Sequence, residues 1–130
     1  MKKFLSGVAL ILVGAFIWNS NWFNKEFFPE QYWSKQVTHF ENLVVMDKAM
    51  IRDAAIEIKK MQLTASLQIA QEVNSAKSLG LSTEEAKREA VEMLKMEIKS
   101  LREDIEFWKE MLKKDTEQLE EVSSHLEQAQ

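Results

Sequence analysis

Residues 79–85 read Leu-Gly-Leu-Ser-Thr-Glu-Glu, and they contain the only glycine or proline after Pro29, so the chain has its one strong turn signal here. Gly80 offers a left-handed cap for the end of a helix. Ser82 and Glu85 have the spacing of a capping box, in which Ser82 precedes the first turn of a new helix. The sequence therefore predicts a turn at 80–82 between a first helix at 34–79 and a second helix at 83–130.

Both arms beside this turn carry an apolar stripe with the three- and four-residue steps of a coiled coil. In the first arm the stripe comprises Val37, Phe40, Val44, Ile51, Ala54, Ile58, Met61 and Ala65, and it continues with longer steps through Ile69, Val73, Ala76 and Leu79. Those longer steps are a stutter, which locally relaxes the supercoil. In the second arm the stripe comprises Val91, Leu94, Ile98, Leu101, Ile105, Trp108, Leu112, Leu119, Val122 and Leu126, and only Asp115 interrupts it.

Two long helices joined by a short turn form an antiparallel pair, here roughly 65–70 Å long at 1.5 Å per residue. The predicted fold class is therefore all-α, a coiled-coil hairpin of two helices. Asp47 and Asp115 fall on the two stripes, and each lies 34 residues from residue 81. We expect them to be polar residues of the seam between the helices that set its register. The end of the second helix forms an acidic tail, with five acidic residues and no lysine or arginine after Lys114.

The amino terminus has the pattern of a membrane signal anchor. Lys2 and Lys3 precede an uncharged apolar run from Phe4 to Trp18, and residues 1–24 together are long enough to span a bilayer. Residues 25–33 continue as an aromatic juxtamembrane segment. The residues expected at the membrane interface are Trp18, Trp22, Phe23, Phe27, Phe28, Tyr32 and Trp33. The alternative is a cleaved secretory signal, for which Val13-Gly14-Ala15 is an acceptable site.

The charges that flank this run predict the orientation of the chain. The cluster of Lys2, Lys3 and the terminal amine favours a cytoplasmic amino terminus. The expected location is the bacterial inner membrane, crossed by a single transmembrane helix, with the C-terminal region in the periplasm and the lipid bilayer as one partner.

Apolar residues outside the two stripes predict a binding surface. They are Leu43, Met46, Met50, Ile56, Leu63 and Leu67 in the first helix and Phe107 and Met111 in the second, with Met93 and Met96 nearby. A two-helix hairpin buries one stripe per helix, so the surplus would form a large exposed apolar patch. We expect these residues to bind other subunits of a membrane complex or a second copy of the chain.

Several classes of function are disfavoured. A net charge of -4 gives no basic footprint for nucleic acid, and no cysteine is present. No nucleophile elbow, phosphate-binding glycine loop or zinc-protease motif occurs, so no enzyme is predicted. His39 and His125 lack the close spacing of metal ligands, and we expect neither a metal nor a cofactor.

The sequence thus predicts a non-catalytic structural or accessory subunit of an inner-membrane complex, which binds its partners through a helical hairpin. One alternative is a soluble periplasmic helical chaperone or stress sensor, released by signal cleavage. The shape also resembles the hairpins of periplasmic adaptors and the anchored rods of phage inner spanins. That resemblance implies a second alternative, a periplasmic rod that reaches another layer through its tip.

Overall fold

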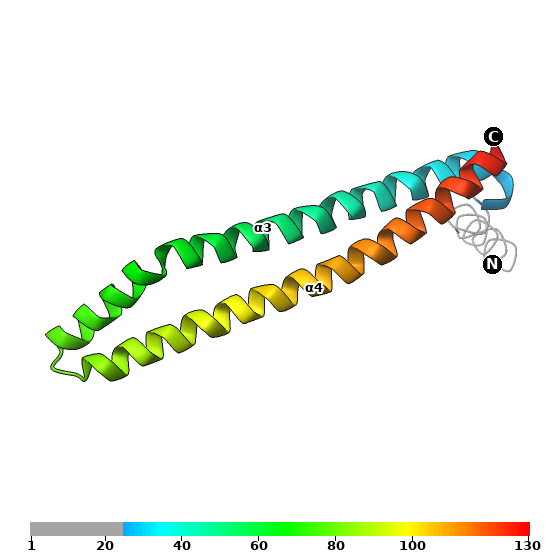
Figure 1. Cartoon of the computed structure of the whole chain (residues 1–130). Coiled ribbons are helices and arrows are strands. Elements are labelled where there is room, and N and C mark those ends of the chain that lie inside the picture. Colours follow the sequence, from blue (N-terminus) through cyan, green and yellow to red (C-terminus); the bar gives the residue numbers. More distant parts are fainter. Residues whose placement is uncertain (1–24) are drawn as a thin grey trace, which may run out of the picture. The chain divides into compact units, whose positions relative to one another are not determined.

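The computed structural model describes residues 25–130, and nearly all of them are helical. Two long helices account for this part of the chain, α3 at Pro29–Ser78 with 50 residues and α4 at Thr83–Ala129 with 47 residues. No β-strand occurs between residues 25 and 130. The predicted all-α, hairpin-like fold is confirmed for the described residues, with α4 packed against α3 (Figure 1).

Helix α3 begins at Pro29, which is earlier than the predicted residue 34. Proline suits the first helical position because its fixed φ angle is already helical and the backbone N–H that it lacks would have no partner there. The carbonyl oxygen of Phe28 accepts a hydrogen bond from the N–H of Tyr32 at 2.9 Å, and Glu30 lies in the first turn. The last part of the aromatic segment at 25–33 therefore belongs to the helix.

The turn between α3 and α4 has the predicted capping geometry at both helix ends. Gly80 has a φ angle of 72°, which is the left-handed conformation that glycine adopts without strain. The N–H of Leu81 donates to the carbonyl of Ala76 at 2.8 Å, and the N–H of Gly80 donates to that of Lys77 at 3.2 Å. This pair of bonds is a Schellman motif. On the other side, Ser82 Oγ accepts a hydrogen bond from the N–H of Glu85 at 3.4 Å.

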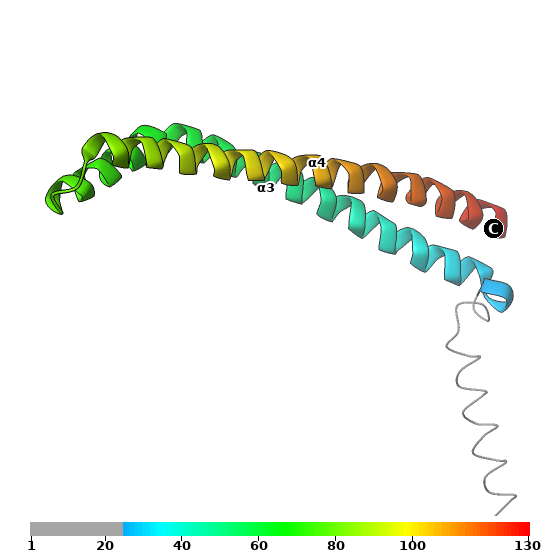
Figure 2. The same cartoon turned by 90° about the horizontal axis from the view of Figure 1, so that it is seen from below.

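The helices contribute to two compact units. One unit comprises the described residues up to Val44 together with Lys114–Gln130, and the other comprises Val45–Lys113. Within the second unit, which contains the turn, the α3 and α4 segments lie side by side in both views of the chain (Figures 1 and 2). All of the grooves and charged edges described below belong to this second unit.

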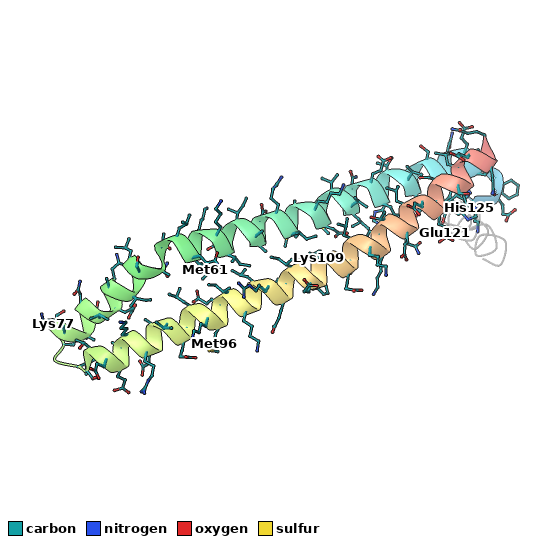
Figure 3. The ribbon with its side chains drawn as sticks, viewed as in Figure 1. Met61, Lys77, Met96, Lys109, Glu121 and His125 are labelled. Carbon is teal, nitrogen blue, oxygen red and sulfur yellow. The ribbon has the colours of Figure 1, made fainter. Side chains whose placement is uncertain are left out.

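In the second unit the predicted stripes form the seam between the helices. Ile51, Ala54, Ile58 and Met61 on α3 are half-buried, as are Leu94, Ile98, Leu101, Ile105 and Trp108 on α4. Figure 3 shows Met61 on the side of α3 that faces α4. Away from the turn, the predicted stripe therefore coincides with the seam of this unit.

Near the turn the covered positions of α4 differ from the predicted stripe. On α4, Ala90 is only 8% exposed, whereas the predicted seam residue Val91 is half-buried. The covered positions there, Ala86, Ala90, Leu94 and Ile98, are four residues apart, and they match the four-residue steps of α3 from Met61 to Val73. Four-residue steps relax the supercoil, so the stutter predicted for the first helix has a counterpart in the second.

In the first unit, Val122 is buried and Val37, Phe40, Leu119 and Leu126 are half-buried. The rings of Trp33 and His125 stack there, with centroids 4.2 Å apart and planes 13° apart. Stacking between α3 and α4 therefore adds to the seam in this unit.

Residues 1–24, which include the predicted anchor, lie outside the described residues. Between residues 25 and 130, no helix is both long and apolar enough to cross a membrane.

Candidate interaction surface

The predicted second apolar stripe lies exposed on α3. Ile56, Leu63 and Leu67 keep 46%, 74% and 60% of their surface exposed. Neighbouring seam residues such as Ile58 and Ala65 are half-buried against α4. Since residues 56, 63 and 67 project away from the seam, the fold of this unit leaves much of their apolar surface exposed. We call Ile56, Leu63 and Leu67 the outer strip.

The other predicted binding residues of α3 and α4 are covered to different extents. Met46 and Met50 are 44% and 41% exposed, and Phe107 is 56% exposed. Leu43 and Met111 are half-buried, so their own units already cover part of each side chain. The predicted set is thus divided, with its most exposed members on the outer face of α3.

Helix α4 carries exposed apolar residues beyond the predicted set. Met93 and Met96 are 62% and 69% exposed, and Figure 3 shows Met96 on the side of α4 turned away from α3. Val45 on α3 is also exposed, as are Leu79 and Leu81 beside the turn, so the prediction that Leu79 belongs to the apolar stripe of the seam is wrong. The two methionines were visible in the sequence as surplus residues, whereas Val45 belongs to neither stripe and carried no signal.

A groove runs beside the seam at the level of Trp108. It encloses about 280 Å³, and its lining combines an apolar floor with three carboxylates. The lining residues are Met50, Asp53, Ala54, Glu57, Leu101, Asp104 and Trp108. Met50 is thus the one predicted binding residue that lines a groove.

A second groove lies close to the turn and has the same chemistry. It encloses about 400 Å³ and is lined by Gln68, Gln71, Glu72, Ser75, Ala76, Leu79, Leu81, Ala86, Glu89, Ala90, Met93, Leu94 and Glu97. No lysine or arginine lines either groove. Small residues of the seam near the turn, such as Ala76 and Ala90, leave the space that forms this groove.

The basic side chains of the second unit lie outside the two grooves. On α4, Lys95, Arg102 and Lys109 are spaced by seven residues and therefore share one face of the helix. Arg52 and Lys59 share a face of α3 in the same way, and all five are exposed. The ion pairs of this group join neighbours within a helix, Arg52 with Asp53 at 3.6 Å and Lys109 with Glu106 at 3.4 Å. Figure 3 labels Lys109 on α4.

Both predicted polar seam residues are buried. Asp47 has no exposed surface and Asp115 is 7% exposed, each at a stripe position of its helix. The Oδ2 atom of Asp115 is buried without a hydrogen-bond partner in the part of the chain that the structure describes. The heptad pattern located these two buried carboxylates, although it gave no information about their hydrogen bonds.

The predicted membrane-interface residues differ in their surroundings. Phe27 and Phe28 are exposed, whereas Tyr32 and Trp33 are half-buried. Besides its stacking on His125, Trp33 lies 5.4 Å from the ammonium nitrogen of Lys25, measured to the ring centroid. Trp33 thus has contacts within the protein that the sequence did not predict. Trp18, Trp22 and Phe23 lie outside the described residues.

The two histidines take no part in a group that would hold a metal. His125 stacks on Trp33, and His39 is exposed with an edge-to-face contact to Phe40. Within residues 25–130, no group of three or more histidine, aspartate or glutamate side chains is placed to hold a metal ion.

Comparison with known proteins gives no family assignment. No family model matches the chain, and neither a curated protein nor a solved structure resembles it significantly. The chemistry of the surface is therefore the basis on which a function can be inferred.

Proposed function

We propose that this chain is a non-catalytic structural or accessory subunit of a bacterial inner-membrane complex, in which the helical hairpin binds a partner protein. The observation that carries the proposal is the exposed outer strip of Ile56, Leu63 and Leu67 on α3. The predicted anchor at residues 1–24 supports the membrane location, since its basic start and apolar run have the composition of a signal anchor.

The outer strip is suited to protein binding for an energetic reason. Burying a leucine or isoleucine side chain is worth roughly 1.5–3 kcal/mol, so the strip offers several kcal/mol towards an interface. Residues 61–71 around Leu63 and Leu67 contain no charged side chain. A partner that covers this stretch therefore has no ionised group to desolvate there.

The proposed partner surface is apolar, with aliphatic or aromatic side chains at helical spacing. The strip is the convex side of a helix, and small-molecule sites are usually concave. Met93 and Met96 on α4 are also exposed in the same unit, although they do not adjoin the outer strip. Methionine adapts to irregular surfaces, which suits a binding role.

Substitution of Leu63 and Leu67 by glutamate in the full-length chain tests the proposal. Neither residue belongs to the seam, so helical content and melting temperature should stay close to those of the wild type. Purification in mild detergent should recover the partner with the wild type and lose it with L63E/L67E. The matched control is Gln62→Glu with Ser66→Glu, which adds the same two charges to the same helical turns at exposed positions outside both grooves.

Two outcomes would contradict the proposal. If L63E/L67E loses its helical signal, these leucines belong to a core rather than to a binding surface. If the variant stays folded and retains every protein that co-purifies with the wild type, the outer strip is not the partner surface.

A further inference from the structure

Charge is segregated between two edges of the second unit. One edge carries the two grooves, which are lined by six carboxylates and by no basic side chain. These carboxylates belong to Asp53, Glu57, Glu72, Glu89, Glu97 and Asp104. We call this edge the acidic edge.

Helical periodicity places the basic residues on the other edge. Glu97 and Asp104 directly precede the seam residues Ile98 and Ile105, whereas Lys95, Arg102 and Lys109 directly follow the seam residues Leu94, Leu101 and Trp108. In a heptad repeat, the position before one kind of seam residue and the position after the other kind lie on opposite sides of the seam. This second edge, the basic edge, comprises Lys48, Arg52, Lys59, Lys95, Lys99, Arg102, Lys109 and Lys113, with Glu92 and Glu106 among them. Within residues 25–130, Arg52 alone of these pairs with a residue of the acidic edge, Asp53, at 3.6 Å on the outer side of α3.

The two edges have their charges at the same heights along the hairpin. Glu57 and Lys59 are two residues apart in α3, and Asp104 and Arg102 are two residues apart in α4. Two residues correspond to a rise of about 3 Å along a helix. If a second copy is displaced perpendicular to the long axis of the hairpin, with no axial shift and no reversal of direction, its basic edge therefore lies against the acidic edge of its neighbour.

We propose that copies of this chain associate side by side and in the same direction, with the basic edge of one hairpin in the acidic grooves of the next. A foreign basic helix would neutralise the acidic edge alone, whereas a second copy neutralises both edges. The shared direction also suits chains whose residues 1–24 are anchored in one bilayer. Such an interface uses two different surfaces, so it repeats from copy to copy into a row or a closed ring.

The grooves supply the apolar part of this interface. Long lysine and arginine side chains bury their aliphatic stems on apolar surfaces while their charged ends reach acidic groups. The groove beside Trp108 offers such a floor, with Glu57 and Asp104 at its rim. An arginine that enters it can also lie against the indole ring, which adds a cation–π attraction.

Reversal of charge on each edge tests the proposal in the full-length chain in mild detergent. One variant carries Glu57→Lys, Glu97→Lys and Asp104→Lys, and the other carries Lys59→Glu, Lys99→Glu and Arg102→Glu. All six positions are exposed, so the helical content of each variant should match that of the wild type. Sedimentation and chemical cross-linking report self-association.

The wild type should self-associate, and more weakly at high salt because screening shortens the range of surface electrostatics. Each variant alone should associate at least roughly tenfold more weakly, since three favourable pairs become three like-charge pairs. An equimolar mixture of the two variants should associate again. The first variant then carries basic residues on both of its edges, and the second carries acidic residues on both, so the two variants complement each other. A chain with all six changes should also self-associate.

Three results would overturn the proposal: a monomeric wild type, unchanged association of either variant, or a mixture of folded variants that stays apart. If the acidic-edge variant instead loses a basic partner protein while self-association persists, the grooves bind that partner. The L63E/L67E variant separates the two proposals, because it should lose the partner of the outer strip and keep self-association through the edges.

Discussion

Replacement of Asp115 by leucine should stabilise the protein. Asp115 is 7% exposed, and its Oδ2 atom is buried without a hydrogen-bond partner among the described residues. It occupies a stripe position between Leu112 and Leu119, where leucine continues the apolar pattern of α4. The substitution thus removes a buried polar atom and adds an apolar side chain at the same place.

The magnitude follows from two favourable effects and one unfavourable effect. A buried acceptor without a partner costs about 1–3 kcal/mol. Burying leucine contributes about 1.5–3 kcal/mol, while the extra volume in a packed seam costs about 1–3 kcal/mol. We expect a net gain of about 2 kcal/mol in the free energy of unfolding. At about 4–8 °C per kcal/mol, the melting temperature should rise by roughly 8–16 °C.

Thermal unfolding followed by circular dichroism measures this gain. The control is Glu117→Leu, which removes the same charge and adds the same side chain at an exposed position of α4. It should change stability by no more than about 0.5 kcal/mol. Asp115→Asn removes the charge but keeps a polar side chain of the same shape, so its stability should fall between those of the wild type and Asp115→Leu. A melting temperature that is unchanged or lower for Asp115→Leu, with the control unaffected, would show that the carboxylate is well accommodated in the seam and that the reasoning is wrong.

Two further predictions concern the turn and the amino terminus. Gly80→Ala should lower the free energy of unfolding by about 1–2 kcal/mol because φ is 72°, and an added Cβ would meet nothing within 4 Å, so the whole cost is backbone strain. Gly80→Asn should cost less. A melting temperature of Gly80→Ala equal to that of the wild type would contradict the capping role. Full-length protein should stay in the membrane fraction after an alkaline carbonate wash, because the apolar run within residues 1–24 is expected to span the bilayer. Release of the full-length protein into the soluble fraction would exclude a spanning anchor.

Much of the hairpin was predictable because its signals are local. The conformation of Gly80 and the cap at Ser82 depend on a few neighbouring residues, so the stretch from Leu79 to Glu85 was sufficient to predict the turn. The seam was predictable because burial on one side of a helix imposes a repeat of three and four residues. The same repeat distinguished the seam from the outer strip on α3, and it located the two buried aspartates.

The sequence was less informative where packing decides between neighbouring positions. Ala90 is more buried than Val91, although valine is the more apolar residue, because the four-residue steps near the turn bring position 90 towards α3. The half-buried state of Met111 and the stacking of Trp33 on His125 likewise depend on which residues of the opposite helix come near. The periodicity of a single helix contains no such information.

The two long helices, the short turn between them and the apolar face of each helix could be predicted from the residues alone, since all three follow from local conformation and burial. Which flank of α3 lies beside which flank of α4 depends on how the helices pack. Only that pairing gathers Asp53 and Glu57 with Asp104 around one groove, although they are distant in the sequence. An antiparallel pairing with a fixed register brings one flank of α3 beside one flank of α4 on each side of the seam. Each edge combines residues of both helices, so the acidic and basic edges form only when the helices pair.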